Sequence, residues 1–275
     1  MKRGWKMFWV VCGAVMAIGF IFCAIAWGMG VTTNMVYDRF PDGIGWVETD
    51  SGSSAENIHE TYTGVKEIDL DLAAGKVKIV EGEGREIRVD TDNLSKRLGF
   101  RCYMEGNELK LTSKKRFSGV NNIGRGTITI QIPKEMTFEE VSLSMGAGTL
   151  NVNSIYTRDL SVEIGAGEVN LDRFQADEAE FDCGAGSITA TGDVRSSADI
   201  SCGVGSVVFT ALGREEEYNY DIECGVGEVM CGNDSYSGLG KDRHIDNNAD
   251  KDISVEGGVG SVIIDFKESD FMNAR

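Results

Sequence analysis

Residues 141–159 read VSLSMGAGTLNVNSIYTRD, residues 160–178 read LSVEIGAGEVNLDRFQADE and residues 179–197 read AEFDCGAGSITATGDVRSS. Further copies follow at residues 198–219, 220–231 and, after an insertion, 253–266. The Gly-x-Gly units begin at Gly146, Gly165, Gly184, Gly203, Gly225 and Gly258, so the first three intervals are 19 residues each. Such a regular interval indicates an internal structural repeat.

Apolar and polar side chains alternate on both sides of each glycine pair. Val141, Leu143 and Met145 precede the first pair, and Leu150 and Val152 follow it. Alternation with period two is typical of half-buried strands. Two short strands cannot bury their own apolar face, so neighbouring units must stack. The sequence therefore predicts an all-β fold, a single-stranded parallel β-solenoid (β-helix-like) with coils of about 19 residues.

We expect the glycines to form a corner in every coil, where unusual φ and ψ values and close backbone approach favour a residue without a Cβ. The predicted corner residues are Gly146, Gly148, Gly165, Gly167, Gly184, Gly186, Gly203, Gly205, Gly225, Gly227, Gly258 and Gly260. The intervening residues should stack as a small-residue column, and they are Ala147, Ala166, Ala185, Val204, Val226 and Val259.

The repeat extends weakly into residues 65–140, which we predict to be irregular first coils. Within them, residues 68–79 read IDLDLAAGKVKI and match one repeat closely. Residues 141–266 are the regular repeats with an insertion at 232–252, and residues 267–275 form a tail.

The IDLDLAAGKVKI segment followed by repeated GAG units resembles the bacterial "putative adhesin" domain of unknown function, over roughly residues 65–266. The resemblance implies a solenoid that often follows a single membrane helix, as in LiaG-like proteins. It implies no catalytic residues, because the family supplies none.

The first 64 residues have the pattern of a membrane anchor and a stalk. Residues 7–31 carry no charge, and about 20 apolar residues suffice for a transmembrane helix. The basic residues of the tip, residues 1–6, place the amino terminus in the cytoplasm and the rest of the chain outside. A signal peptide cleaved near Ala24-Ile25-Ala26 is the alternative, and it also exports the remainder. Residues 32–64 are predicted to be a polar linker.

The charge distribution excludes some partners. The chain of 275 residues has a formal net charge of −17, and residues 141–275 hold 25 of its 44 acidic residues. Such a chain lacks the basic surface of a nucleic-acid binder, so we expect no nucleic-acid partner. We also expect no cofactor, because the glycine pairs run into strands and not into a phosphate-binding helix. The sequence leaves the oligomeric state open.

Acidic residues recur at outward positions of the repeat. Glu163, Asp182, Glu223 and Glu256 share one position and are the candidates for binding a divalent cation or a cationic ligand. Glu180, Asp199 and Asp221 share another position two residues earlier. A solvated face that opposes aggregation is the alternative interpretation.

Cysteines recur at one inward position, and Cys183, Cys202 and Cys224 should stack in successive coils. Buried thiols that replace Met145 and Ile164 as core residues are one interpretation. A disulfide is another interpretation, because stacked strands bring Cα atoms within disulfide range and the predicted location outside the cytoplasm permits oxidation. A metal site is the third, although a straight column does not surround a tetrahedral ion.

The insertion GNDSYSGLGKDRHIDNNADKD, residues 232–252, is the candidate partner loop through Asp234, Asp242, His244, Asp246 and Asp250. Carboxylate pairs also serve carbohydrate-active β-helix enzymes, which is a distant alternative. We expect no enzyme, because His59 lies in the predicted stalk and no His-dependent triad emerges.

Together these patterns predict a membrane-anchored, extracytoplasmic, adhesin-like binding or scaffold module of the bacterial cell envelope. The expected partners are the membrane, through residues 7–31, and a cell-wall polymer or envelope protein. An accessory protein of envelope-stress regulation, acting through membrane partners, is the alternative.

Overall fold

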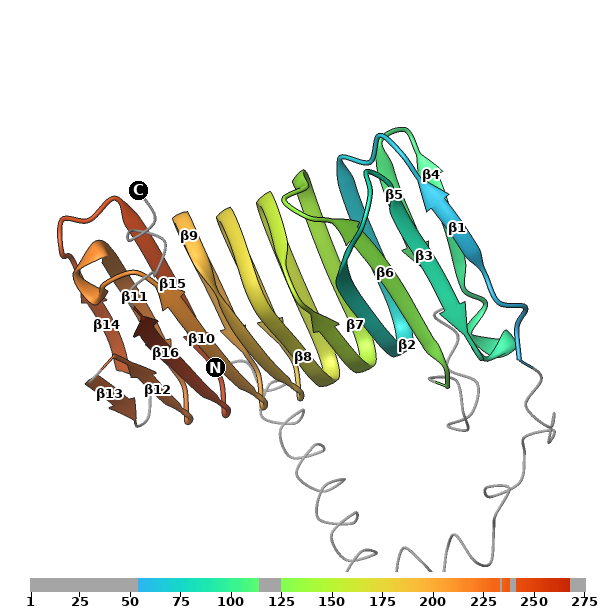
Figure 1. Cartoon of the computed structure of the whole chain (residues 1–275). Coiled ribbons are helices and arrows are strands. Elements are labelled where there is room, and N and C mark those ends of the chain that lie inside the picture. Colours follow the sequence, from blue (N-terminus) through green and yellow to red (C-terminus); the bar gives the residue numbers. More distant parts are fainter. Residues whose placement is uncertain (1–53, 114–124, 233, 238–240, 268–275) are drawn as a thin grey trace, which may run out of the picture. The chain divides into compact units, whose positions relative to one another are not determined.

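The alternating segments of the repeat become strands that pair side by side in a 16-stranded sheet. The computed structural model describes residues 54–113, 125–232, 234–237 and 241–267. The strands stack as the rungs of a ladder (Figure 1). The expected all-β, solenoid-like fold is therefore confirmed, and the described residues contain only two short 3-10 helices.

The strands are β1 (His59–Tyr62), β2 (Glu67–Gly82), β3 (Ile87–Asp92), β4 (Arg101–Glu105), β5 (Glu108–Thr112), β6 (Thr127–Pro133), β7 (Thr137–Val152), β8 (Ile155–Cys183), β9 (Ser187–Cys202), β10 (Ser206–Leu212), β11 (Tyr218–Cys224), β12 (Glu228–Cys231), β13 (Asp234–Ser237), β14 (Lys241–Ile245), β15 (Lys251–Gly257) and β16 (Ser261–Lys267). The 3-10 helices are η1 (Lys96–Leu98) and η2 (Glu215–Glu217).

The central coils pair in parallel and in the register that the repeat predicts. Val141 of β7 lies beside Leu160 of β8, and Ala179 of β8 lies beside Ala198 of β9. The IDLDLAAGKVKI segment belongs to the same ladder, because Gly75 of β2 lies beside Gly148. Inward side chains of these strands are buried and form one hydrophobic core.

The last two coils are interchanged relative to the sequence, which differs from the simple ladder that we expected. Strands β15 and β16, the final repeat, lie between β9–β10 and β11–β12. Residues 218–231 are therefore the outermost parallel coil. The insertion supplies β13 and β14, which pair antiparallel with β12 and β11. These capping strands follow residue 231 directly and occupy the outer side of β11 and β12. The final repeat can therefore pair only with the inner side of these strands, next to β9 and β10.

The opposite end of the solenoid has the same arrangement. Strands β5 and β6 pair in parallel with the outer side of β2, although they follow β2 in sequence. Strands β3 and β4 cover them in antiparallel orientation. Parallel pairing is thus confined to the coils, and antiparallel strands close both ends.

The predicted linker, residues 32–64, extends too far, because its last part belongs to the folded domain. Strand β1 pairs antiparallel with β3, and Ala55 donates a backbone hydrogen bond of 2.7 Å to Leu94 O. Residues 55–62 are therefore part of the cap, where β1 covers the edge of β3. The predicted anchor, residues 7–31, lies outside the described residues. Within the described part of the chain, no helix is long and apolar enough to cross a bilayer.

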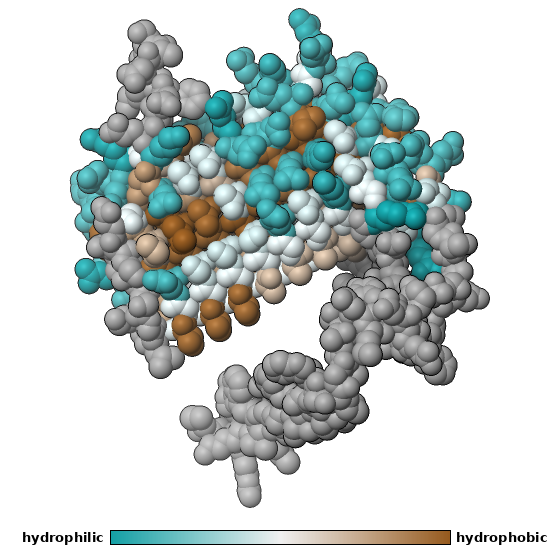
Figure 2. Space-filling view, turned by 60° about the horizontal axis from the view of Figure 1, so that its bottom comes forward, coloured by the Kyte–Doolittle hydropathy of each residue, from teal (hydrophilic) through white to brown (hydrophobic). Residues whose placement is uncertain are grey.

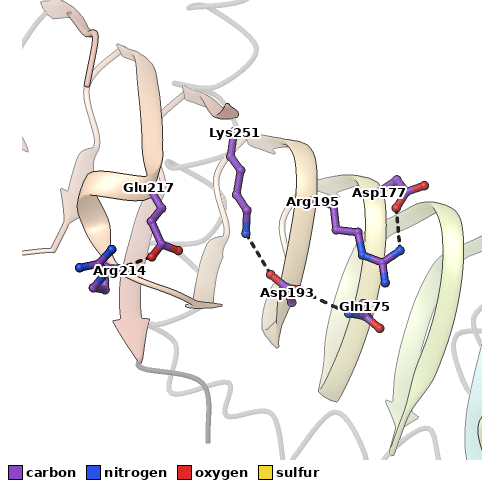
Figure 3. A network of polar contacts seen from close by, with 7 residues as sticks. All are labelled: Gln175, Asp177, Asp193, Arg195, Arg214, Glu217 and Lys251. Atoms are coloured by element: carbon purple, nitrogen blue, oxygen red, sulfur yellow. Dashed lines mark hydrogen bonds and ion pairs between the residues drawn. The ribbon is translucent and has the colours of Figure 1, made fainter. Parts of the chain in front are cut away.

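Side chains also connect the coils along the side opposite the glycine corners (Figure 3). Lys251 Nζ, at the start of β15, lies 3.1 Å from Asp193 Oδ1 of β9. Gln175 Nε2 donates to Asp193 Oδ2 at 3.4 Å, and Arg195 Nη1 lies 3.2 Å from Asp177 Oδ1. The first contact links β15 to β9 and so helps to hold the returning chain in place, and the other two link β8 to β9.

The glycine corners confirm the close approach that the sequence predicts. A Cβ on Gly165 would lie 2.6 Å from Gly146 O, and a Cβ on Gly167 would run into Gly148 O. Gly167 also has a φ of +127°, which side chains rarely adopt. The later corners follow the spatial order of the coils, since Gly258 faces Gly203 and Gly225 faces Gly258.

Replacing the corner glycine Gly167→Ala should lower the free energy of unfolding of the full-length protein by about 2–4 kcal/mol, through the clash and the unfavourable φ together. Urea unfolding followed by circular dichroism measures the change. Gly64→Ala is the matched control, because Gly64 has a φ of +70° with open space around it. The control should cost about 1 kcal/mol. Equal effects of the two substitutions would contradict the close approach at the corner.

The interchange of coils predicts which exposed corner residues are neighbours. Val259 N donates to Gly203 O at 2.8 Å and Val226 N donates to Gly258 O at 2.8 Å. Val204 therefore lies one coil, about 5 Å, from Val259 and two coils, about 10 Å, from Val226. Paired substitution of Val204→Cys with Val259→Cys should give a disulfide under mild oxidation, since Cα separations below about 7 Å allow one.

The matched control pairs Val204→Cys with Val226→Cys, and the parent protein controls for the native thiols. Mass spectrometry of alkylated peptides identifies the bridge. A disulfide in the control pair and none in the first pair would show that the last coils stack in the order in which they occur in the sequence.

Candidate functional site

The predicted acidic column, Glu163, Asp182, Glu256 and Glu223, lies on one outward face, but one serine interrupts it and another lies at its end. Ser201 lies between Asp182 and Glu256, and Glu223 lies beside Glu256. At the inner end, Ser144 Oγ donates to Glu163 Oε2 at 3.0 Å. The four predicted candidates therefore do not form one continuous row of carboxylates.

A second acidic column consists of Glu180, Asp199 and Asp221. It is also interrupted, because Ser254 lies between Asp199 and Asp221. At the Glu180 end of this column lies an open hollow of about 210 Å³. Its carboxylates are Glu140, Asp159, Glu178, Glu180 and Asp199.

Two carboxyl groups of these columns are electrostatically strained. Burial raises the pKa of Glu180, and the carboxylates of Asp182, Asp199 and Glu163 raise this pKa further. Burial likewise raises the pKa of Asp182, with added repulsion from Glu163 and Glu256. A bound cation would relieve this repulsion. Among the described residues, however, no group of three or more His, Cys, Asp or Glu side chains is placed to hold a metal ion.

The cysteine column is broken by the interchange of coils, which corrects the expected stacking. Cys183 lies beside Cys202, but Gly257 lies between Cys202 and Cys224. All three thiols are free and buried. Burial and the neighbouring Cys183 raise the pKa of the Cys202 thiol. Two of the three thiols are thus neighbours, and the third is separate.

The insertion that we expected to be a partner loop is largely a cap. Asp242 and His244 on β14 lie beside Glu223 and Asp221 of β11. Asp246 is engaged within its own turn, where its Oδ1 accepts a 2.8 Å hydrogen bond from Asn248 N. Asp250 is exposed before β15, and Asp234 begins β13 beside Cys231. The five residues are therefore distributed along the cap and not gathered around one centre.

On the last three coils, the predicted column of residues between the corner glycines becomes part of an apolar surface, which the sequence did not identify as a candidate site. Val204, Val259 and Val226 stack at the corner with 69%, 62% and 61% of their surface exposed. On the adjoining face, Ile263 lies between Val208 and Met230. Met230 is 37% exposed, and the other two are half-buried. We call these six residues the apolar patch.

Figure 2 shows apolar residues in a row along one edge of the domain, with a paler band and a second apolar area beside it. The sequence contained a signal for this patch. The residue four positions after the middle of each Gly-x-Gly unit is outward-facing, and it is Asn151, Asn170 and Thr189 in the central coils but Val208, Met230 and Ile263 in the last ones.

Residues 65–268 match the family model described as Toastrack DUF4097, which confirms the resemblance to an adhesin-like domain of unknown function. The crystal structure of a putative cell adhesion protein from Clostridium sporogenes ATCC 15579 is similar, with 16% identity over 77% of this chain and 100% of that one and a TM-score of 0.44. A putative adhesin from Bacteroides fragilis NCTC 9343 shows 16% identity over 77% of this chain and 98% of that one, with a TM-score of 0.35. No curated protein matches the chain.

The strained carboxyls predict a specific dependence of stability on pH. A carboxyl with a raised pKa holds its proton more tightly in the folded than in the unfolded state, so acidification through the window just above the ordinary carboxyl pKa favours folding. Asp182→Asn should therefore raise the free energy of unfolding at pH 7 by no more than about 1 kcal/mol, which appears as a higher urea midpoint. The substitution should also reduce the increase in the free energy of unfolding that acidification produces.

Urea titrations at a series of pH values measure both effects. Asp172→Asn is the matched control, because Asp172 is an exposed carboxylate of β8 outside both acidic columns. A lower midpoint for Asp182→Asn at pH 7 would show that this carboxylate stabilises the fold.

Proposed function

Because the chain belongs to the Toastrack DUF4097 family, we propose that it is an adhesin-like binding or scaffold module, held at the outer side of a bacterial cell membrane by residues 7–31. Its proposed partners are a cell-wall polymer or another envelope protein. Binding, and not catalysis, is the proposed role of the exposed side chains.

The observation that carries this proposal is the ladder itself. Successive coils repeat at about 5 Å, so outward residues of equivalent position form straight columns on rigid strands. The columns present carboxylates on one face and apolar side chains at the corner of the last coils. A rigid array of repeated side chains suits an extended partner that contacts several coils at once.

The charge pattern of the first residues supports the location. Residues 7–31 are uncharged, and Lys2, Arg3 and Lys6 precede them. The positive-inside rule then directs the solenoid outward. Its acidic second half would be repelled by an anionic lipid surface, which favours partners away from the bilayer.

A phosphatase reporter that folds only outside the cytoplasm, fused after Arg275, should be active and should sediment with membranes. Activity assays on whole cells and membrane fractions measure both properties. The same fusion without residues 7–31 is the control, and it should lose activity because export depends on this segment.

A reporter that is active only in the cytoplasm would contradict the proposed location. Release of the active fusion from the membrane would indicate cleavage near Ala26 in place of a retained anchor. Proximity labelling from the same fusion point should tag envelope components, and labels confined to cytoplasmic proteins would contradict the proposed partners.

A further inference from the structure

The apolar patch is a property of particular residues and not of the fold. The outward position occupied by Val208, Ile263 and Met230 is occupied by Asn151, Asn170 and Thr189 in the coils before them. At the corner, alanines occupy the equivalent sites of the same coils. The solenoid therefore tolerates polar or small residues at these sites. The larger apolar side chains expose surface to water without contributing to the core.

The three valines form the most exposed part of the patch. Each keeps more than half of its surface accessible, and backbone hydrogen bonds between the coils fix their spacing. The row therefore projects apolar groups at regular intervals from a rigid corner. A row of exposed apolar side chains of this kind marks an interaction site more often than apolar residues scattered singly over a surface do.

Carboxylates surround the patch on both faces of the corner. Glu223 and Glu256 lie three residues before Val226 and Val259, on one face. On the other face, Asp265 follows Ile263 in the outward alternation of β16, and Glu228 lies between Val226 and Met230 in sequence. The cations of the strands around the patch are Lys251, which is paired with Asp193 on the opposite side of the coil, Lys267 at the end of β16, and Lys241 and Arg243 on the capping strand β14.

The combination determines the chemistry of the occupant. A second copy of the chain would bring two acidic rims together, and an anionic membrane would meet the same repulsion. A polypeptide segment with an apolar stripe flanked by Lys or Arg would bury the valines and place its cations on the carboxylates. We propose that the apolar patch binds a cationic amphipathic polypeptide segment, and this inference rests on the proposed binding function.

The test uses the full-length protein in nanodiscs of zwitterionic lipid and a synthetic 18-residue peptide of Leu and Lys, with Leu at helical spacing. Binding is measured by fluorescence anisotropy against empty nanodiscs. Simultaneous Val204→Thr, Val226→Thr and Val259→Thr keeps the β-branched shape and removes the apolar surface. This variant should weaken binding by roughly tenfold.

Three comparisons test whether binding is specific to the patch. Simultaneous Ala147→Ser, Ala166→Ser and Ala185→Ser alters the same corner in earlier coils and should leave the affinity within about twofold. Glu223→Gln with Glu256→Gln should weaken binding and reduce its dependence on salt, because exposed ion pairs are screened. A scrambled Leu and Lys peptide should bind more weakly than the amphipathic one.

Unchanged affinity in the threonine variant would overturn the inference, as would equal binding of a Leu and Glu peptide. Self-association that the threonine variant abolishes would assign the patch to a second copy instead. Binding to anionic vesicles that depends on the valines would assign it to the membrane. Each of these results would leave the proposed exported location intact, whereas a cytoplasmic reporter would reject that location independently.

Discussion

The structure depends on the close approach of neighbouring backbones at the glycine corner. Carbonyl oxygens of one coil occupy the space where the next coil would carry a Cβ, as between Gly148 and Gly167. This approach lets each coil turn sharply and still pair in register with the next coil on both sides of the corner. The inward Val, Leu and Ile side chains then meet across a narrow interior and form one core.

The second constraint is the open edge of a parallel sheet. An exposed edge strand offers unpaired N–H and C=O groups to other chains. Both ends of this solenoid have the same arrangement. At each end the chain adds antiparallel capping strands, and one coil lies out of sequence order. Strand β15 and strand β5 are consequently internal, while β1, β4, β13 and β14 take the outer positions.

This interchange determines the surface as well as the fold. It separates Cys224 from Cys202 and Asp221 from Asp199, because Gly257 and Ser254 lie between them. It also places Val259, and not Val226, beside Val204 in the row of three valines. The order of neighbours in the acidic columns and in the apolar patch is thus a consequence of how the end of the chain returns.

Much of the architecture was predictable from the sequence, because period-two alternation and a 19-residue interval are local patterns that translate directly into strands and stacked coils. The glycine corners and the place of residues 68–79 in the ladder follow from the same pattern. The order of the coils was not predictable, because the repeats at 220–231 and 253–266 carry nearly the same pattern and either could pair with residues 198–212. Only the tertiary structure decided between them, since the capping strands must lie outermost, and that decision set which residues of the last coils are neighbours.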